Sequence, residues 1–233
     1  MTREEYIKNI LNHYSVVSVL ADKNDCKTLR LRNKALSKDI VLHSLQGNAK
    51  IYSFLCEISC KNLPIIYDSI NLEDGIIVLE EYIDGITVAQ VLDGGLYRYS
   101  GAKKVLSSVC NALVCLHDNG FVHRDIKPEN IIIDKNGRVV LLDFNTSRKI
   151  SVASKDTVVM GTVGYASPEQ LGIAQSDART DIYALGVLLN VMLCGKHPSE
   201  QFARGKAGKI VRKCTNVNPN DRYQTVKELY KAL

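Results

Sequence analysis

Four side chains near the middle of the chain carry chemistry that belongs together. Residues 123–130 read His-Arg-Asp-Ile-Lys-Pro-Glu-Asn, and Asp143 follows thirteen positions after Asn130. The carboxylate of Asp125 can accept a proton from a hydroxyl group, and the ammonium of Lys127 can neutralise phosphate charge. The amide oxygen of Asn130 and the carboxylate of Asp143 are hard oxygen donors of the kind that Mg²⁺ binds. This spacing predicts a site for phosphoryl transfer on a loop between two strands.

Residue patterns before and after this loop predict the elements that must position it. Short β-branched or alternating runs favour strands at residues 14–20, 28–32, 39–45, 63–69 and 76–82, with a helix at 50–60. After the turn at Asp84-Gly85 the pattern favours helices at 101–119, 181–193 and 225–233, with two short strands at 131–133 and 139–142. The sequence therefore predicts an α+β fold, in which a small antiparallel sheet with one helix precedes a larger, mainly helical lobe.

Size and composition are those of an ordinary soluble globular domain. The 233 residues are 45% hydrophobic and 24% charged, which is enough to bury one full core. The net charge of +5 includes two denser basic stretches, at residues 23–38 and 204–213, which we interpret as solvated faces. Aromatic residues do not interleave with these charges, so we expect no nucleic-acid partner.

Cysteine usage and the N-terminal residues predict the compartment. Seven cysteines without a Cys-x-x-Cys pair, and the absence of a secretory signal, indicate reduced thiols. Cys110 and Cys115 lie in an apolar helical stretch and are interpreted as core residues. No apolar run approaches the ~20 residues that span a membrane, so we expect a cytoplasmic chain. The sequence leaves open whether the chain stands alone or is a domain of a longer, membrane-tethered protein, and it does not reveal the oligomeric state.

Three further motifs follow the loop in order. Residues 161–169 read Gly-Thr-Val-Gly-Tyr-Ala-Ser-Pro-Glu, residues 181–186 read Asp-Ile-Tyr-Ala-Leu-Gly, and residues 219–223 read Pro-Asn-Asp-Arg-Tyr. Together with the loop, they make the chain resemble the eukaryotic-type, or Hanks-type, serine/threonine protein kinases, especially those of bacteria. The resemblance implies the two-lobed protein-kinase fold as a single domain over residues 1–233, with an N-lobe at about 1–82, a C-lobe at about 83–233 and the nucleotide in the cleft between them.

The resemblance assigns a role to each side chain of the loop. It implies that Asp125 orients the substrate hydroxyl and takes its proton, and that Lys127 stabilises charge on the transferred phosphoryl group. Asn130 and Asp143 are the implied Mg²⁺ ligands and belong to the nucleotide site. Asn145 stands where the family has a glycine, and asparagine tolerates left-handed backbone. The implied cofactors are ATP and Mg²⁺, and the implied partner is a protein with a serine or threonine hydroxyl, including the chain itself.

Other positions receive structural roles from the resemblance. His123 and Phe144 are expected to pack and to align the loop, with His123 a core histidine rather than a ligand. Asp181 is expected to bind the backbone of the catalytic loop. Arg222 is expected to pair with Glu169 at the end of the activation segment.

Regulatory and specificity roles are more open. Thr162 is expected to pack beneath the substrate hydroxyl and to favour serine or threonine targets. Arg124 could bind a phosphate on the activation segment, since arginine pairs well with phosphoryl groups. Ser151, Ser154 and Thr157 are candidate acceptors of that phosphate, and each is also interpretable as an ordinary polar loop residue.

The expected nucleotide site departs from the family pattern in the first third of the chain. Residues 21–27 contain no glycine, although the family places glycines there so that backbone can approach the phosphates. His43 stands at the position of the lysine that grips the α- and β-phosphates, and no glutamate lies near 51–53 to pair with it. The nucleotide-binding residues expected from this lobe are His43, Glu81 and Ile83.

A carboxylate stands at the back of the expected adenine pocket. A buried carboxylate needs a partner, so we hypothesise that Glu80 pairs with His43 across neighbouring strands. Lys27 or Arg30 on the second strand could replace the missing lysine. Lys27 is favoured because it shares strand parity with the apolar Leu29, and the alternative is that both cations face solvent.

Three functions are compatible with this pattern. The leading hypothesis is an active serine/threonine protein kinase, because all four side chains of the loop are intact. The missing glycines, lysine and glutamate favour instead a pseudokinase that regulates or scaffolds a partner without catalysis. A kinase of small molecules is the third hypothesis, and the complete activation segment at 161–169 argues against it because that segment supports a peptide. The short region 194–218 predicts a reduced docking surface.

Overall fold

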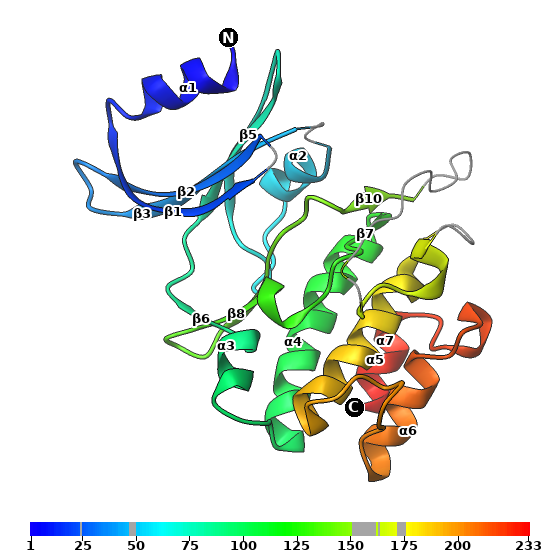
Figure 1. Cartoon of the computed structure of the whole chain (residues 1–233). Coiled ribbons are helices and arrows are strands. Elements are labelled where there is room, and N and C mark those ends of the chain that lie inside the picture. The colour runs from blue at the N-terminus through cyan, green and yellow to red at the C-terminus, as the bar shows by residue number, and fades with distance from the viewer. Residues whose placement is uncertain (24, 47–49, 151–161, 163, 172–175) are drawn as a thin grey trace. The chain divides into compact units, whose positions relative to one another are not determined.

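The protein is described from a computed structural model, which covers residues 1–23, 25–46, 50–150, 162, 164–171 and 176–233 (Figure 1). The chain forms two compact units. The first comprises residues 1–59 and 64–84, and the second comprises residues 60–63 and 85–233. Each unit is described by itself.

The first unit is built on a five-stranded antiparallel sheet. Its strands are β1 (Tyr14–Lys23), β2 (Cys26–Asn33), β3 (Asp39–Leu45), β4 (Ile66–Leu72) and β5 (Gly75–Glu81), in the spatial order β1-β2-β3-β5-β4. Helix α2 (Lys50–Glu57) follows β3 and packs against β4. The predicted sheet with one helix between its third and fourth strands is confirmed.

A helix that the sequence interpretation missed precedes the sheet. Helix α1 (Arg3–Ile10) starts with a capping box, in which Thr2 and Glu5 satisfy each other's backbone N–H groups. The helix lies over the sheet (Figure 1). Its side chains Tyr6, Ile7 and Ile10 pack on a buried cluster of the sheet. This cluster consists of Leu29, Leu31, Ile40, Leu42 and Ile77. Helix α1 therefore covers part of one face of the sheet.

The segment expected to be a loop over phosphates is mostly strand. Pairing of β1 with β2 continues to Lys23 and Cys26, which leaves a short turn in place of the expected loop over residues 21–27. The carboxylate of Asp22 lies 3.2 Å from the ammonium of Lys27 across the hairpin. Both side chains are more than 40% exposed, so this pair contributes at most ~1 kcal/mol.

The fourth strand begins later than the sequence pattern indicates. A strand was expected at residues 63–69, but β4 spans Ile66–Leu72 and residues 60–63 group with the second unit. Asn62 holds this segment there, because its side chain donates to the carbonyl of Val139 at 2.7 Å and its own carbonyl accepts from Leu141 N–H at 3.0 Å. The segment expected as one strand, residues 63–69, is therefore divided between the two units.

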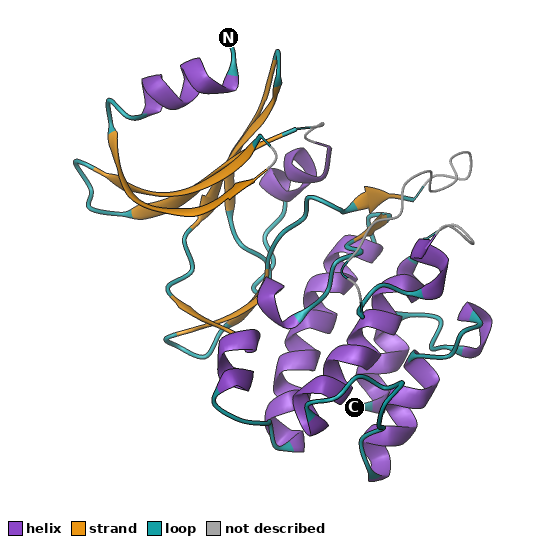
Figure 2. Cartoon of the chain, viewed as in Figure 1, coloured by secondary structure: helices purple, strands orange, loops and turns teal. Residues whose placement is uncertain are grey.

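The second unit is mainly helical, as the sequence predicts (Figure 2). Its elements are β6 (Gly85–Thr87), α3 (Val88–Asp93), α4 (Tyr99–His117), β7 (Phe121–Val122), η1 (Pro128–Asn130), β8 (Ile131–Asp134), β9 (Val139–Leu141), β10 (Arg148–Lys149), η2 (Pro168–Leu171), α5 (Ala178–Cys194), α6 (Gly205–Cys214), η3 (Pro219–Asp221) and α7 (Val226–Ala232). Strands β6, β8 and β9 form a small antiparallel sheet, and β7 pairs with β10. The chain between β7 and β9 carries the predicted catalytic loop.

Helix α5 is the centre of this unit. It is apolar on nearly every side and eleven of its residues are buried, as expected for a helix packed all round by protein. Asp177 caps its start with Thr180, and Gly195 ends it with a left-handed φ of 68°. The predicted helix at 181–193 is confirmed and begins three residues earlier than expected, at Ala178. Its first turn places Asp181 beneath the catalytic loop.

The α+β fold class predicted from the sequence is confirmed, with an antiparallel sheet in one unit and a helical second unit. In the part of the chain that the structure describes, no helix is both long enough and apolar enough to cross a membrane.

Candidate active site

The backbone of the catalytic loop is held by a fully buried carboxylate. Asp181 accepts the N–H of His123 at 2.9 Å on one oxygen and the N–H of Arg124 at 2.8 Å on the other. The ring nitrogen Nε2 of His117 lies 2.8 Å from the same carboxylate. Burial alone raises the pKa of Asp181, but these hydrogen bonds and the nearby histidines outweigh it and lower the pKa below its usual value. The predicted structural role of Asp181 is confirmed.

His123 is a core histidine, as predicted. It is fully buried, and its ring meets that of Phe144 edge to face at 5.3 Å between centroids. Its Nδ1 lies 3.3 Å from the N–H of Asp125, and its Nε2 lies 3.1 Å from the carbonyl of Leu142. A neutral ring with the proton on Nε2 satisfies both contacts, because Nδ1 then accepts and Nε2 donates. Burial lowers the pKa of His123, which favours this neutral form.

The carboxylate of Asp125 is the centre of the candidate site. It accepts the ammonium of Lys127 at 2.7 Å on Oδ2 and the hydroxyl of Thr162 at 2.6 Å on Oδ1. Asn130 donates its amide N–H to the same Oδ2 at 3.0 Å and to the Asp125 carbonyl at 2.9 Å. Burial tends to raise the pKa of Asp125, but the hydrogen bonds from Lys127 and Thr162 hold it below its usual value. Asp125 is therefore ionised near pH 7, as a proton acceptor must be.

Lys127 also joins Thr162 directly, with Nζ 2.7 Å from the hydroxyl oxygen. Three side chains, Asp125, Lys127 and Thr162, thus form a closed triangle of hydrogen bonds. Oxygen Oδ1 of Asp125 accepts one hydrogen bond in this arrangement, and a carboxylate oxygen has room for two. That oxygen can accept a second hydroxyl without breaking the triangle.

Asn130 and Asp143 present oxygen donors that suit Mg²⁺. Because the amide nitrogen of Asn130 donates to Asp125, its amide oxygen is the atom left for a metal. The backbone brings the two residues together, since Leu142 N–H donates to the Asn130 carbonyl at 2.8 Å and Asp143 comes next. The described residues contain no group of three or more histidine, cysteine, aspartate or glutamate side chains arranged for a metal. A bound Mg²⁺ would complete its shell with water and phosphate oxygens, as it usually does.

The loop has left-handed backbone at two non-glycine residues. Arg124 has a φ of 74° and Asp143 a φ of 64°. Such conformations cost free energy and gather at functional sites. The hydrogen bonds from Asp181 to Arg124 N–H and from Gln170 to the Arg124 carbonyl, at 2.8 Å each, hold the first of them. Asn145 is not among the described residues with positive φ, so its expected tolerance of that conformation is not used.

The end of the activation segment is anchored by the predicted ion pair. Arg222 donates two parallel hydrogen bonds to Glu169, at 2.7 and 2.9 Å, and both side chains are buried. Burial raises the pKa of Glu169, but Arg222 more than offsets this and the pKa lies below its usual value. This pairing is confirmed. Ser151, Ser154 and Thr157 lie outside the described residues.

In the first unit, the hypothesised pair of His43 and Glu80 is present. Nε2 of His43 lies 3.5 Å from a carboxylate oxygen of Glu80, and Nδ1 lies 3.2 Å from the hydroxyl of Thr28. Glu80 is 4% exposed. The two side chains share a sheet face because β3 and β5 pair Val41 with Glu80, and Val41 is two residues from His43. A buried carboxylate is thereby matched by an imidazole.

The other expected nucleotide-binding residues, Glu81 and Ile83, lie at and just after the end of β5. Glu81 is the last residue of β5, and it holds Ile65 twice, by its backbone N–H at 2.8 Å and by its carboxylate at 3.1 Å. Ile83 follows two residues later and is 7% exposed. Their contact with a nucleotide stays a prediction.

The preference for Lys27 as the replacement cation is wrong. Its parity with the buried Leu29 puts it on the sheet face that α1 covers, opposite to the face of His43. Arg30 is on the His43 face, and it is engaged there by the carboxylate of Asp39 at 2.7 Å and by the ring of Tyr82 at 4.0 Å.

Sequence reasoning missed two residues that support the loop. His117 ends helix α4 and contacts Asp181, and Gln170 contacts the Arg124 carbonyl. Neither has a local motif that announces its partner, since the pairs are 64 and 46 residues apart. Helix periodicity placed His117 at the end of its helix but could not show which residue it faces.

Comparison with known proteins identifies relatives of the chain. The sequence profile of the protein kinase domain matches residues 14–232. A probable serine/threonine-protein kinase of Clostridium perfringens is 29% identical over 201 residues, which are 75% of this chain and 29% of that protein. Serine/threonine-protein kinase PknB of Mycobacterium tuberculosis is 32% identical over 180 residues, covering 65% of this chain and 29% of that kinase. Serine/threonine-protein kinase D of Synechocystis is 28% identical over 225 residues, which are 86% of this chain and 44% of that kinase. The chain thus spans less than half the length of these relatives.

Proposed function

Because the chain belongs to the protein kinase domain family, of the bacterial Hanks type, we propose that it is a serine/threonine protein kinase. It transfers the γ-phosphoryl group of ATP to a hydroxyl group of a protein, or to its own activation segment. The observation that carries this proposal is the ionised Asp125, which Lys127, Thr162 and Asn130 hold in one orientation.

The chemistry follows from that geometry. Asp125 accepts a hydrogen bond from the substrate hydroxyl on Oδ1 and takes its proton as the oxygen attacks phosphorus. The ammonium of Lys127, beside the same carboxylate, stabilises charge on the transferred phosphoryl group. The hydroxyl of Thr162, in the activation segment, donates to Oδ1 of Asp125 and so fixes the carboxylate. The substrate hydroxyl would bind the same oxygen, so Thr162 leaves room there for the small aliphatic hydroxyl of serine or threonine.

Mg²⁺ is the metal that fits the oxygen donors of Asn130 and Asp143. When bound, it would neutralise charge on the phosphates of ATP. What the chain itself supplies is orientation, because the Asn130 amide is fixed by Asp125 and its oxygen cannot rotate away without breaking two hydrogen bonds.

The nucleotide site is atypical on the side of the first unit. His43, Glu81 and Ile83 are the proposed nucleotide-binding residues there, and no glycine-rich loop stands before them. The imidazole of His43 takes the place of the usual lysine ammonium, held by Thr28 and facing Glu80. We expect weaker binding of ATP than in kinases that have the lysine, because a neutral imidazole offers the phosphates one donor and no full charge.

The second candidate function is that of a pseudokinase, a regulatory or scaffold module without catalysis. The specific observation in its favour is that His43 contacts protein side chains without any nucleotide, since Nδ1 lies 3.2 Å from the Thr28 hydroxyl and Nε2 faces the buried Glu80 at 3.5 Å. In this case the catalytic loop would be retained without use.

Phosphoryl transfer from labelled ATP with Mg²⁺ distinguishes the two functions. We expect label on the chain or on a generic basic protein, and at least about a hundredfold less with Asp125→Asn, which removes the proton acceptor. Asp118→Asn is the matched control, because Asp118 lies on the surface in an ion pair with Lys227 and is 55% exposed. Equal label from Asp125→Asn and wild type would refute the role of Asp125. No label from any variant, with Mn²⁺ also tried, would favour the pseudokinase, and a thermal-shift titration with ATP would then test nucleotide binding.

A further inference from the structure

One of the two basic stretches of the sequence surrounds helix α6. The sequence holds 30 lysines and arginines and 25 aspartates and glutamates. Residues 201–220 contain five of the basic residues and none of the acidic ones, so the remainder of the chain has 25 of each and no net charge. The five cations are Arg204, Lys206, Lys209, Arg212 and Lys213. The other basic stretch, at residues 26–38, has the same excess, but its Lys27, Arg30 and Arg32 pair with Asp22 and Asp39.

Helix α6 presents these charges on one face. Its residues Ala207, Ile210 and Val211 are buried, and the helix packs against α5. Lys206 and Lys209 are exposed on the opposite side, one turn apart. The side chains of Arg204 and Lys209 make no hydrogen bond or ion pair with any residue that the structure describes. Lys206 donates from Nζ to the carbonyl of Leu233 at 3.1 Å, so Arg204 and Lys209 are the cations of this face that a partner can engage most readily.

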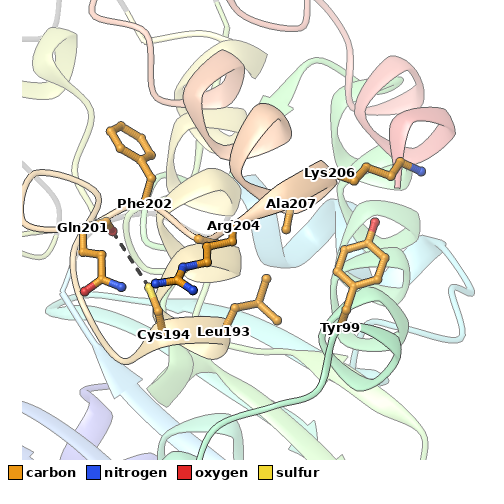
Figure 3. A pocket seen from close by; sticks show the side chains of 9 residues that line it. Tyr99, Leu193, Cys194, Gln201, Phe202, Arg204, Lys206 and Ala207 are labelled. Atoms are coloured by element: carbon orange, nitrogen blue, oxygen red, sulfur yellow. Dashed lines mark hydrogen bonds between the residues drawn. The ribbon is translucent and has the colours of Figure 1, made fainter.

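A cavity of about 530 Å³ opens beside the start of this helix (Figure 3). Leu193, Ala203 and Ala207 supply apolar wall, and Arg204 and Lys206 stand among the lining residues. In the view of Figure 3, Leu193 and Ala207 lie between Tyr99 on one side and Arg204 on the other. The described residues that line the cavity include no carboxylate. Its size is within the range of sites that hold a small ligand or a side chain.

We propose that the α6 face and this cavity bind an acidic protein segment that carries an apolar side chain. The apolar side chain enters the cavity, and carboxylates next to it pair with Arg204 and Lys209. Concentrated charge of one sign attracts a partner of the other sign. An apolar pocket beside the charges fixes the position at which the partner binds, because only its apolar side chain fits there. This surface is separate from Asp125 and its partners, so the binding does not require phosphoryl transfer.

The aromatic residues near this face argue for a protein rather than a nucleic acid. Arg212 stacks on Phe202 at 3.9 Å, and Lys213 lies 4.4 Å from the centre of the Tyr223 ring. The hydroxyl of Tyr99 donates to the carbonyl of Leu233 at 2.9 Å. The cations occupy a face of the Phe202 ring and of the Tyr223 ring, so these faces are not open to stacking on bases, which is how single-stranded nucleic acids are commonly held.

The position of the apolar groups argues against a membrane surface. Helices that bind membranes push large apolar side chains outward from the charged face. Here the apolar groups are recessed in the cavity, and the exposed residues of α6 are glycine, lysine and arginine. A recessed pocket accepts a protruding side chain of a partner instead.

Fluorescence anisotropy with purified protein tests the proposal. The probe is a short labelled peptide with one phenylalanine flanked by glutamates, and a second probe has serine in place of the phenylalanine. We expect the phenylalanine probe to bind more tightly, since only it fills the cavity. Raising the salt from 0.05 to 0.5 M should weaken binding several-fold, because screening shortens the reach of surface charges from more than 10 Å to a few Å.

A matched pair of variants locates the binding. Arg204→Gln with Lys209→Gln should weaken the phenylalanine probe by about 2- to 30-fold, as expected for two exposed charge pairs. Lys23→Gln with Lys38→Gln removes the same net charge from the first unit and should leave affinity unchanged. Equal affinity in both double variants would overturn the proposal, and so would tighter binding of single-stranded RNA or of vesicles with anionic lipid. Unchanged binding by Asp125→Asn is expected, so failure of the kinase proposal would not affect this test.

Discussion

Replacing Asp181 by asparagine tests whether one buried carboxylate sets the shape of the catalytic loop. The carboxylate accepts two backbone N–H groups, those of His123 and Arg124, on different oxygens. An asparagine of the same shape has one oxygen and one NH₂ group, and the NH₂ group cannot accept. One of the two N–H groups must therefore lose its partner. The favoured orientation keeps the oxygen toward His123 and His117, and it leaves the N–H of Arg124 facing an NH₂ group.

The magnitude follows from burial. Asp181 is fully buried, so water cannot replace the lost acceptor. A buried N–H group without a partner costs about 1–3 kcal/mol. For a chain of this size each kcal/mol lowers Tm by about 2–4 °C, so Tm should fall by about 2–12 °C. The loss falls on Arg124, whose φ of 74° is unfavourable without support, and Arg124 precedes the proposed base. A shift of the base by an ångström costs roughly 100-fold in rate, so kcat should fall by about 10- to 100-fold.

Thermal unfolding and phosphoryl-transfer rates of three proteins check this reasoning. The wild type and Asp181→Asn are compared with Asp177→Asn, which makes the same substitution at the cap of the same helix. Asparagine caps helices as well as aspartate does, and the ion pair of Asp177 with Arg179 is partly exposed, so this control should lose at most about 1 kcal/mol. A Tm for Asp181→Asn within about 1 °C of wild type, together with an unchanged kcat, would refute the claim that Asp181 positions the loop.

Three further outcomes are expected. Glu169→Gln leaves a buried guanidinium without its counter-charge, so it should lower the free energy of unfolding in urea by about 3–5 kcal/mol. Because the pKa of Glu169 is lowered in the folded state, the stability from this pair should be present above about pH 4.5 and be lost as the pH falls through the folded pKa. A wild-type stability that is flat down to pH 2 would contradict this pH dependence. The thiols of Cys60 and Cys115 lie 3.0 Å apart, and burial together with this contact raises the pKa of Cys115 to about 12. Because the thiolate is the reactive form, diamide should oxidise the pair to a disulfide faster at pH 9 than at pH 7. Mass spectrometry should show the loss of two hydrogens, and Cys60→Ser should abolish that loss. Glu80→Gln should move the midpoint of the His43 imidazole titration in NMR to lower pH, because a carboxylate at 3.5 Å favours the protonated ring, and an unmoved midpoint would show that the two side chains do not interact.

The catalytic loop could be predicted side chain by side chain because its chemistry lies in a few consecutive residues. Asp125, Lys127 and Asn130 are brought together by a short turn, so their order in the sequence already fixes their neighbourhood. The pairing of Arg222 with Glu169 is 53 residues apart and came from the resemblance rather than from any local pattern. His117 had no such help, and its contact with Asp181 depends on how two helices pack.

The first unit was harder to predict, for reasons that its strands make clear. Period-two alternation shows which residues share a face of β2, but it does not show which face a helix covers. Leu29 faces α1, so the parity argument placed Lys27 on the covered face and away from His43. The sequence does contain a signal for helix α1, because Thr2 and Glu5 form a capping box before an apolar stripe. This signal was missed because the N-terminal residues are mostly polar.

The two units support different functions, and the physical cost of their polar groups shows which carries more weight. Glu80 is buried in a sheet and lies 3.5 Å from the His43 imidazole, so a side chain of the protein already faces this carboxylate. Asp181 and Glu169 likewise hold backbone and ion-pair contacts on which the second unit depends. Asp125 is different, because its carboxylate gathers an ammonium and a hydroxyl that hold nothing else in place among the described residues. An ionised carboxylate that three polar side chains hold in one orientation is what the proposed proton transfer requires, and this favours the kinase proposal over the pseudokinase.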